Sequence, residues 1–159
     1  MITSLESILE AHPFLKGLKP EYTNLIVGCA SNIRFEAGKE IHREGEEADT
    51  FYIIRHGKVA IEIFVPGRGN ITIETLGEGE ILGWSWLFPP FRWHANARAL
   101  ELTRAIALDG KCLRSKCEND PALGFELIKR LARIMMDRLH GFRLQLLDLY
   151  KTESHQVRK

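Results

Sequence analysis

The most informative part of this chain is Gly77–Ala99, GEGEILGWSWLFPPFRWHANARA. It begins with closely spaced glycines, continues through an apolar turn, and ends in the alternating ANARA at positions 95–99. A bend of this kind between extended segments can direct backbone N–H groups toward a small anion. The same stretch holds Trp84 and Trp93, so we expect aromatic rings beside that anion.

On both sides of this stretch, short apolar runs with a period of two are closed by glycine. Such runs predict β-strands, and the glycines supply the positive φ that tight corners need. They predict a small antiparallel barrel or roll over residues 31–109, built from Ile33–Phe35, Phe51–Ile54, Val59–Ile63, Ile71–Ile73, Ala95–Ala99 and Thr103–Leu108.

Helical patterns flank the strands. Leu5–Ala30 is predicted to be helical with an interruption at Pro13, because apolar residues there recur at helical spacing. A second helical region covers residues 110–150. Asp120-Pro121 is a good helix start within it, and no further proline follows. One domain is therefore expected over residues 1–150, with a polar tail at 151–159.

The long helix carries a heptad pattern. Its apolar residues are spaced 4, 3, 4, 3, 4, 3, which is typical of a coiled-coil seam. We expect the distal half to meet a copy of itself in a homodimer, and the alternative is that the stripe packs within its own domain. The seam consists of Ile128, Ala132, Met135, Leu139, Phe142, Leu146 and Leu149.

Composition argues for an ordinary cytoplasmic globular domain. The 159 residues are 45% hydrophobic and 27% charged, with a formal net charge of +1. A nucleic-acid-binding domain usually carries a clear basic excess, which is missing here. The N-terminus lacks the basic start and apolar core of a signal peptide, and no apolar run reaches the ~20 residues that cross a bilayer.

The cysteines and histidines predict neither disulfides nor a metal site. Three cysteines, an odd number without a disulfide framework, favour a reducing compartment. Cys112 and Cys117 are five apart, so they share a helix face poorly. The six histidines are scattered without metal-ligand spacing.

Helices, an eight-stranded roll and a long terminal helix together resemble the cyclic nucleotide-binding domain family, which includes the sensing domain of the catabolite activator protein and protein kinase A regulatory subunits. The resemblance covers about Leu5 to Tyr150. It rests on residues 35–49, FEAGKEIHREGEEAD, on residues 51–59, FYIIRHGKV, and on residues 76–83, LGEGEILG. It implies an α+β, mainly β fold: a jelly-roll-like antiparallel β-roll with N-terminal helices, a short phosphate-cassette helix and a long dimerisation helix.

In this family the cassette runs Gly-Glu-Leu-Ala, a spacer, then Arg-Ala/Ser-Ala. The resemblance implies that the Glu binds the ribose hydroxyl, the Arg pairs with the cyclic phosphate, and a short helix directs N–H groups at that phosphate. Here Trp84 stands at the Glu position and Trp93 at the Arg position. Arg92 is one residue earlier, and a one-residue offset in extended chain turns a side chain to the opposite face. A bulge at Pro89-Pro90 is one way for Arg92 to face inward.

Two interpretations follow. In the first, the pocket binds a cyclic nucleotide, cyclic AMP or cyclic GMP, in an atypical way. The backbone and hydroxyl near Ser85 hold the phosphate, a basic side chain adds charge, and a tryptophan stacks on the base. In the second, the pocket has lost cyclic nucleotides, and the aromatic residues fill it or bind a more apolar ligand. The candidate ligand-binding residues are Gly83, Trp84, Ser85, Trp86, Arg92, Trp93, His94 and Ala95.

The resemblance also implies a mechanism without catalysis. Gly83–Phe88 is the expected moving turn, and the long helix is the expected lid, with Met135, Met136 and Arg138 nearest a ligand. We expect a stand-alone sensor without a DNA-binding domain, because only Thr152–Lys159 follow the helix. The signal is then read by a separate effector protein. No cofactor and no enzymatic activity are expected, since no nucleophile–base pair, phosphate loop or metal triad is present.

Overall fold

The computed structural model describes residues 4–156 and consists of two four-stranded antiparallel sheets with four helices. It confirms the predicted eight-stranded roll. The first sheet has the order β1 (Ala30–Phe35), β8 (Thr103–Asp109), β3 (Thr50–His56) and β6 (Ile81–Leu82). The second has the order β2 (Glu40–His42), β7 (Asn96–Ala99), β4 (Val59–Val65) and β5 (Gly69–Leu76).

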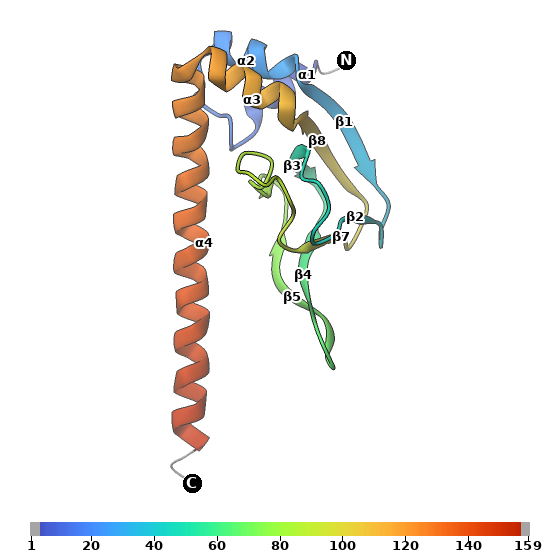
Figure 1. Ribbon diagram of the computed structural model, residues 1–159, viewed down its shortest axis with the longest axis vertical. Coiled ribbons are helices and arrows are strands. Elements are labelled where there is room, and N and C mark those ends of the chain that lie inside the picture. Colours follow the sequence, from blue (N-terminus) through green and yellow to red (C-terminus); the bar gives the residue numbers. More distant parts are fainter. Residues whose placement is uncertain (1–3, 157–159) are drawn as a thin grey trace.

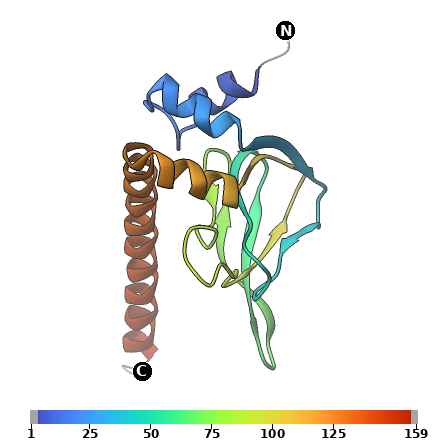
Figure 2. The ribbon, with the colours of Figure 1, turned by 45° about the horizontal axis from the view of Figure 1, so that its top comes forward.

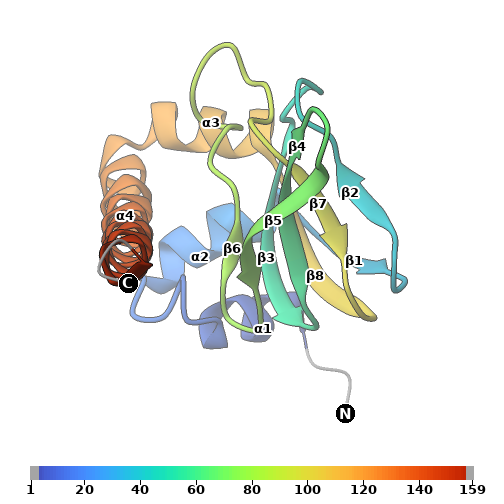
Figure 3. The same ribbon diagram turned by 90° about the horizontal axis from the view of Figure 1, so that it is seen from below.

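The helices gather at one end of the roll, and the last one runs along its side (Figures 1 and 2). They are α1 (Leu5–Ala11), α2 (Pro20–Val27), α3 (Gly110–Asn119) and α4 (Pro121–Gln156). Strands β5 and β6 lie on the side of the roll that faces α4 (Figure 3). Among residues 4–156, no helix combines the length and the apolar character that crossing a membrane requires.

Two predicted helix boundaries were wrong. The predicted helical region 5–30 ends at Val27, and Ala30 already belongs to β1, because its backbone pairs with Leu108 of β8. The predicted polar tail is helical as far as Gln156. Its polar residues are compatible with helix, since an exposed helix needs no apolar stripe to keep its backbone hydrogen bonds. Residues 1–3 and 157–159 of the predicted domain and tail lie outside the described residues.

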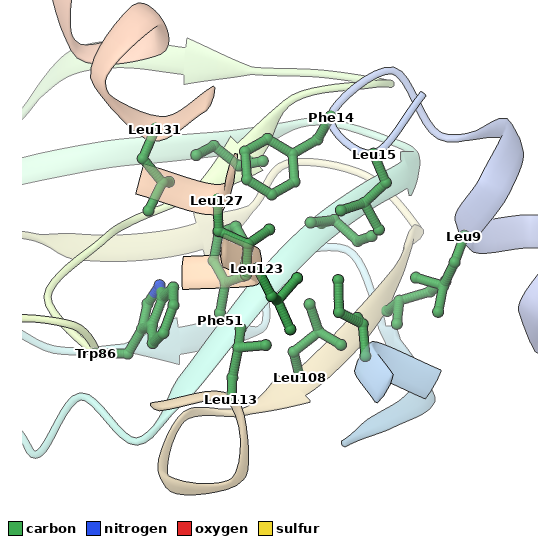
Figure 4. Packing of buried hydrophobic residues seen from close by; sticks show 14 residues of the cluster. Leu9, Phe14, Leu15, Phe51, Trp86, Leu108, Leu113, Leu123, Leu127 and Leu131 are labelled. Carbon is green, nitrogen blue, oxygen red and sulfur yellow. The ribbon is translucent and has the colours of Figure 1, made fainter. Parts of the chain in front are cut away.

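The main core lies between the first sheet and the helices. Alternate residues of β3, Phe51 and Ile53, face the helices, while Ile54 faces the second sheet. Leucines from α1, α3 and α4 close over this face, and the Trp86 ring stacks 5.1 Å from Phe51 (Figure 4). A smaller cluster fills the roll between the sheets: Ile54, Val59, Leu76, Leu82 and Ala97.

A disulfide joins Cys29 to Cys112, and Cys117 is the free cysteine. The prediction that the chain has no disulfide was therefore wrong. The two cysteines are 83 residues apart in the sequence. They meet because Ala30 of β1 pairs with Leu108 of β8, so the residue entering β1 and the helix leaving β8 lie at the same end of the sheet. The Asp109 N–H donates to the Cys29 carbonyl at 2.9 Å, beside the disulfide.

The predicted short cassette helix is a series of turns. Between β6 and β7 the structure has no helix; the Leu87 N–H donates to the Trp84 carbonyl at 3.0 Å and closes a single turn. Pro89 and Pro90 follow at once, and neither has a backbone N–H with which to extend the turn. Residues 83–95 are called the cassette segment below.

Gly57, between β3 and β4, is required for the roll to close. Its φ is +102°, and a Cβ there would lie 2.5 Å from Thr103 Oγ1 and 2.7 Å from the Leu102 carbonyl oxygen. Gly67, at the tip of the β4–β5 hairpin, also has a positive φ (+81°), but nothing lies within 4 Å of its Cβ position.

We predict that Gly57→Ala lowers the free energy of unfolding by about 3 kcal/mol or more, because backbone strain and steric overlap add. Gly67→Ala, the matched control, should lose only about 1 kcal/mol, the cost of the left-handed backbone alone. Urea denaturation followed by circular dichroism measures both. Equal losses in the two variants would contradict the steric argument.

Candidate ligand pocket

A cavity of about 190 Å³ lies between the second sheet, the cassette segment and α4. It brings together seven of the residues proposed from the sequence: Gly83, Trp84, Ser85, Trp93, His94, Ala95 and Arg138. The rest of the lining was not anticipated as ligand contacts and comes from β2, β4, β5, β6 and α4: His42, Ile61, Ile73, Glu74, Leu76, Leu82 and Phe142. Most of this lining is apolar, so the cavity suits a ligand with a largely apolar body.

Trp93 forms the base of the cavity. Its ring stacks on His42 with the centroids 3.7 Å apart and the planes 1° from parallel. Its edge packs against Gly83, where a Cβ would lie 2.3 Å from Trp93 Cζ3. The Trp93 backbone is held at the same time, because its N–H donates to the Glu46 carbonyl and its carbonyl accepts from the Gly45 N–H. The indole is therefore fixed by both its ring and its backbone.

Arg92 lies outside the cavity. It forms a backbone bridge with Glu47, and its side chain is exposed. Neighbouring side chains in extended chain point to opposite faces, so the inward position of Trp93 turns Arg92 outward. The double proline does not reverse this order. Trp86, another expected ligand contact, is buried in the main core instead.

Arg138 is the one α4 residue expected at the ligand that does line the cavity. Its Nη2 donates to the Ile81 carbonyl at 2.7 Å, and its Nε lies 3.3 Å from Glu74 Oε1. Its guanidinium also lies 5.2 Å from the centre of the Trp84 ring, a cation–π distance. Met135 and Met136 do not line the cavity, and Met136 is 70% exposed. Phe142, one turn beyond Arg138, does.

Burial affects both charges of the Arg138–Glu74 pair. It lowers the pKa of Arg138, against the attraction of Glu74 and Glu80, and it raises the pKa of Glu74, against the attraction of Arg138. A buried charge is costly unless it is paired. Each of these two groups is therefore the counter-ion that the other needs.

His42 is uncharged at neutral pH. The residue is only 6% exposed, and neither ring nitrogen has a hydrogen-bond partner within the described part of the chain. Burial lowers the pKa of His42 to about 4, and the nearby Ala95 backbone and Glu40 oppose this only in part. This role of His42 was not predictable from the sequence, since the residue lies in a three-residue strand with no motif of its own.

In residues 4–156, no three His, Cys, Asp or Glu side chains approach closely enough to hold a metal ion. The cavity lining includes one hydroxyl, Ser85, and its buried histidine is stacked face to face on Trp93.

The sequence profile of the family described as Cyclic nucleotide-binding domain matches residues 32–120. The chain belongs to this family. A curated relative, the CRP-like cAMP-activated global transcriptional regulator of Mycobacterium tuberculosis, is 29% identical over 150 residues, covering 94% of this chain and 65% of the relative. The chain thus spans just under two thirds of that protein's length.

Solved structures of the family share this fold. A protein of Geobacter metallireducens assigned to the cyclic nucleotide-binding proteins superposes with a TM-score of 0.76 at 28% identity, covering 87% of this chain and all of that one. The Thermus thermophilus catabolite activator protein superposes with a TM-score of 0.67 at 28% identity, covering 86% of this chain and 63% of that one. Counted back from the alternating alanines at 95–99, residue 93 is where the family cassette would place its phosphate-binding arginine. This cyclic nucleotide-binding domain has the Trp93 indole there.

We predict that His42 makes the domain less stable in mild acid. Between pH 6.5 and about 4 the unfolded chain binds a proton at His42 that the folded protein does not. The stability due to the neutral ring is therefore complete above pH 6.5 and declines as the pH falls toward 4, by about 3 kcal/mol in all. The lowered pKa of buried His12 acts in the same direction.

His42→Phe keeps a ring against Trp93 and removes the titration, so its stability should depend less on pH over this range. His140→Gln, a change at an exposed position on α4, is the control and should follow the wild-type profile. Urea denaturation at several pH values measures the difference. A His42→Phe profile parallel to that of the wild type would contradict the assignment.

Proposed function

We propose that this domain is a regulatory sensor that binds a small organic anion, a cyclic nucleotide or a relative of one, in the cavity and transmits its presence through α4. One observation carries the proposal. Arg138 lines the cavity and, in the same position, fastens α4 to β5, β6 and the cassette segment. A ligand anion that attracts this guanidinium competes with Glu74, so binding and the position of α4 become linked.

Arg138 is also the best substitute for the missing cassette arginine. With Trp93 in that place, a phosphate loses a charge-assisted contact worth about 1.5–3 kcal/mol, which is tenfold or more in affinity. Arg138 brings a buried guanidinium to the same cavity, and exposed His94 adds a second polar group at its edge. Trp84 offers a face for a planar base. We therefore expect weaker binding of cyclic nucleotides than an intact cassette gives.

A second candidate function is a dimerisation or protein-interaction module that no longer binds cyclic nucleotides. The stacked Trp93 and His42 rings favour it, because they fill the base of the cavity with this chain's own side chains. This candidate predicts that no nucleotide stabilises the protein, whereas a sensor is stabilised more as the ligand concentration rises.

We further propose that the protein forms a homodimer through α4 and that a separate effector protein binds the dimer or the surface of this helix. The residues of the predicted seam lie in two different environments. Phe142 turns toward the cavity, while Ile128, Leu139 and Leu146 are about half exposed on α4. Exposed apolar residues at heptad spacing are what a paired helix covers.

Calorimetric titration with cyclic AMP and cyclic GMP tests the sensor. We predict measurable binding by the native chain and at least a tenfold loss in Arg138→Leu, with Arg133→Leu, at an exposed position on the same helix, as the matched control. A thermal-shift series with both nucleotides should give the same ranking. Absence of binding and of any thermal shift in the native protein would reject the sensor and favour the second candidate.

Light scattering tests the dimer. The native chain should have twice the 18.2 kDa mass of one subunit, and Leu139→Lys should be monomeric because it puts a charge into the seam. Asp137→Lys, on the opposite face of α4, should remain dimeric. A Leu139→Lys variant with unchanged mass would refute the seam.

A further inference from the structure

The Cys29–Cys112 disulfide fastens the helix that connects the pocket to α4. Cys29 precedes β1, and Cys112 lies in the first turn of α3. Because Ala30 of β1 and Leu108 of β8 are paired, the bond ties α3 to the rigid end of the first sheet. It closes a long stretch of chain that includes all eight strands of the roll.

The other contacts of α3 reach the cassette segment. The Arg114 guanidinium donates to the Trp86 carbonyl and lies 4.2 Å from the centre of the Phe91 ring. The Gly110 N–H donates to the Asp49 carbonyl at 2.8 Å, and a Cβ at Gly110 would lie 3.3 Å from the Trp86 Cβ. The cassette segment therefore rests on α3.

The far end of α3 leads directly into α4. Only Asp120 separates the two helices, and they pack closely where they meet, since a Cβ at Gly124 would lie 3.1 Å from the Cys117 carbonyl oxygen. A displacement of α3 thus moves the cassette segment and the base of α4 together. The disulfide acts on this shared support.

The two cysteines differ in exposure. Cys29 is 8% exposed, whereas Cys112 is partly exposed at the start of α3. An external thiolate therefore reaches the Cys112 sulfur first. Reduction leaves the fold in place, because Leu113 stays in the main core and the backbone bonds from Asp109 and Gly110 do not involve sulfur.

We propose that Cys29 and Cys112 form a reversible redox site, and that its reduction loosens α3 and weakens the connection between the pocket and α4. A thiolate of a dithiol reductant attacks Cys112 Sγ, and the Cys29 thiolate leaves and takes up a proton. The second thiolate of the reductant then attacks the reductant's sulfur in the mixed disulfide. Cys112 is released and takes up a proton, and the reductant leaves as a cyclic disulfide. Two electrons and two protons pass to the protein.

The expectation of a reducing compartment rested on the absence of a disulfide, so the Cys29–Cys112 bond removes its basis. Where disulfides do form in reducing compartments, they are mostly transient or redox-sensing. The effect on the transmitted signal rests on the proposed sensor function. The redox chemistry and the loosening of α3 do not, so both are tested without a ligand.

Counting thiols in the folded protein tests the chemistry. After oxidation in air without added thiols, the native chain should have one reactive thiol, Cys117, and after dithiothreitol treatment and removal of the reductant it should have three. Reduction should lower the melting temperature by about 5–15 °C while leaving a cooperative transition. Three reactive thiols before reduction, or a bond that is reduced only once the protein unfolds, would overturn the proposal.

Hydrogen–deuterium exchange tests the loosening. Reduction should raise exchange severalfold in residues 83–95 and 110–120, with little change in β4 and β5. The exchange of the double variant Cys29→Ser/Cys112→Ser should match that of the reduced protein and should not change with dithiothreitol. The exchange of the control, Cys117→Ser, should change on reduction as that of the native chain does. Unchanged exchange in residues 83–95 after reduction of the native chain would overturn the proposal, whatever the ligand experiments give.

Discussion

The Arg138 guanidinium attaches the middle of α4 to the roll, and the link between the cavity and this helix depends on that contact. Within one turn of α4, it is the side chain that bonds to β6, pairs with an acid on β5 and lies over a cassette tryptophan. Most apolar residues in the distal half of α4 are exposed. The polar contact that holds the α4 wall of the cavity is therefore Arg138, which is largely buried and paired with Glu74.

Two routes of contact connect the cavity with α4, one through Arg138 and one through α3. The Arg138 route is polar and lies midway along the helix, and in the proposed function it is the route that responds to charge in the cavity. The α3 route is mechanical and acts at the start of the helix, through Arg114 on the cassette backbone and through the close packing around Gly124. A disulfide fixes the second route and leaves the first free. The domain therefore holds the same helix at two separate places, its middle and its start.

The architecture was predictable from the sequence because local patterns determine it. Strands show as alternating apolar residues closed by glycine, and Asp120-Pro121 marks the start of the long helix. Counting back from the alternating alanines placed Trp93 at the position of the family's arginine, and in the structure Trp93 is among the residues that line the cavity. The structure then shows why Arg92 cannot share that position, since adjacent residues in extended chain face opposite ways.

Contacts between distant segments were not predictable. Cys29 and Cys112 are 83 residues apart, and only the register of β1 against β8 brings them together. The proline pair prevents the cassette helix that the family resemblance implied. His42 and Glu74 carry no motif, and they gain their roles only when the roll closes around the cavity.

Exchange across α4 in the unliganded protein shows whether Arg138 holds this helix against the pocket. Hydrogen–deuterium exchange should rise in residues 134–145 and in residues 81–85 when Arg138 is replaced by leucine. It should rise less with Arg138→Lys, which keeps the charge for Glu74 but loses the planar fork. If the leucine variant exchanges like the native chain in both segments, α4 is held by something else and the account fails.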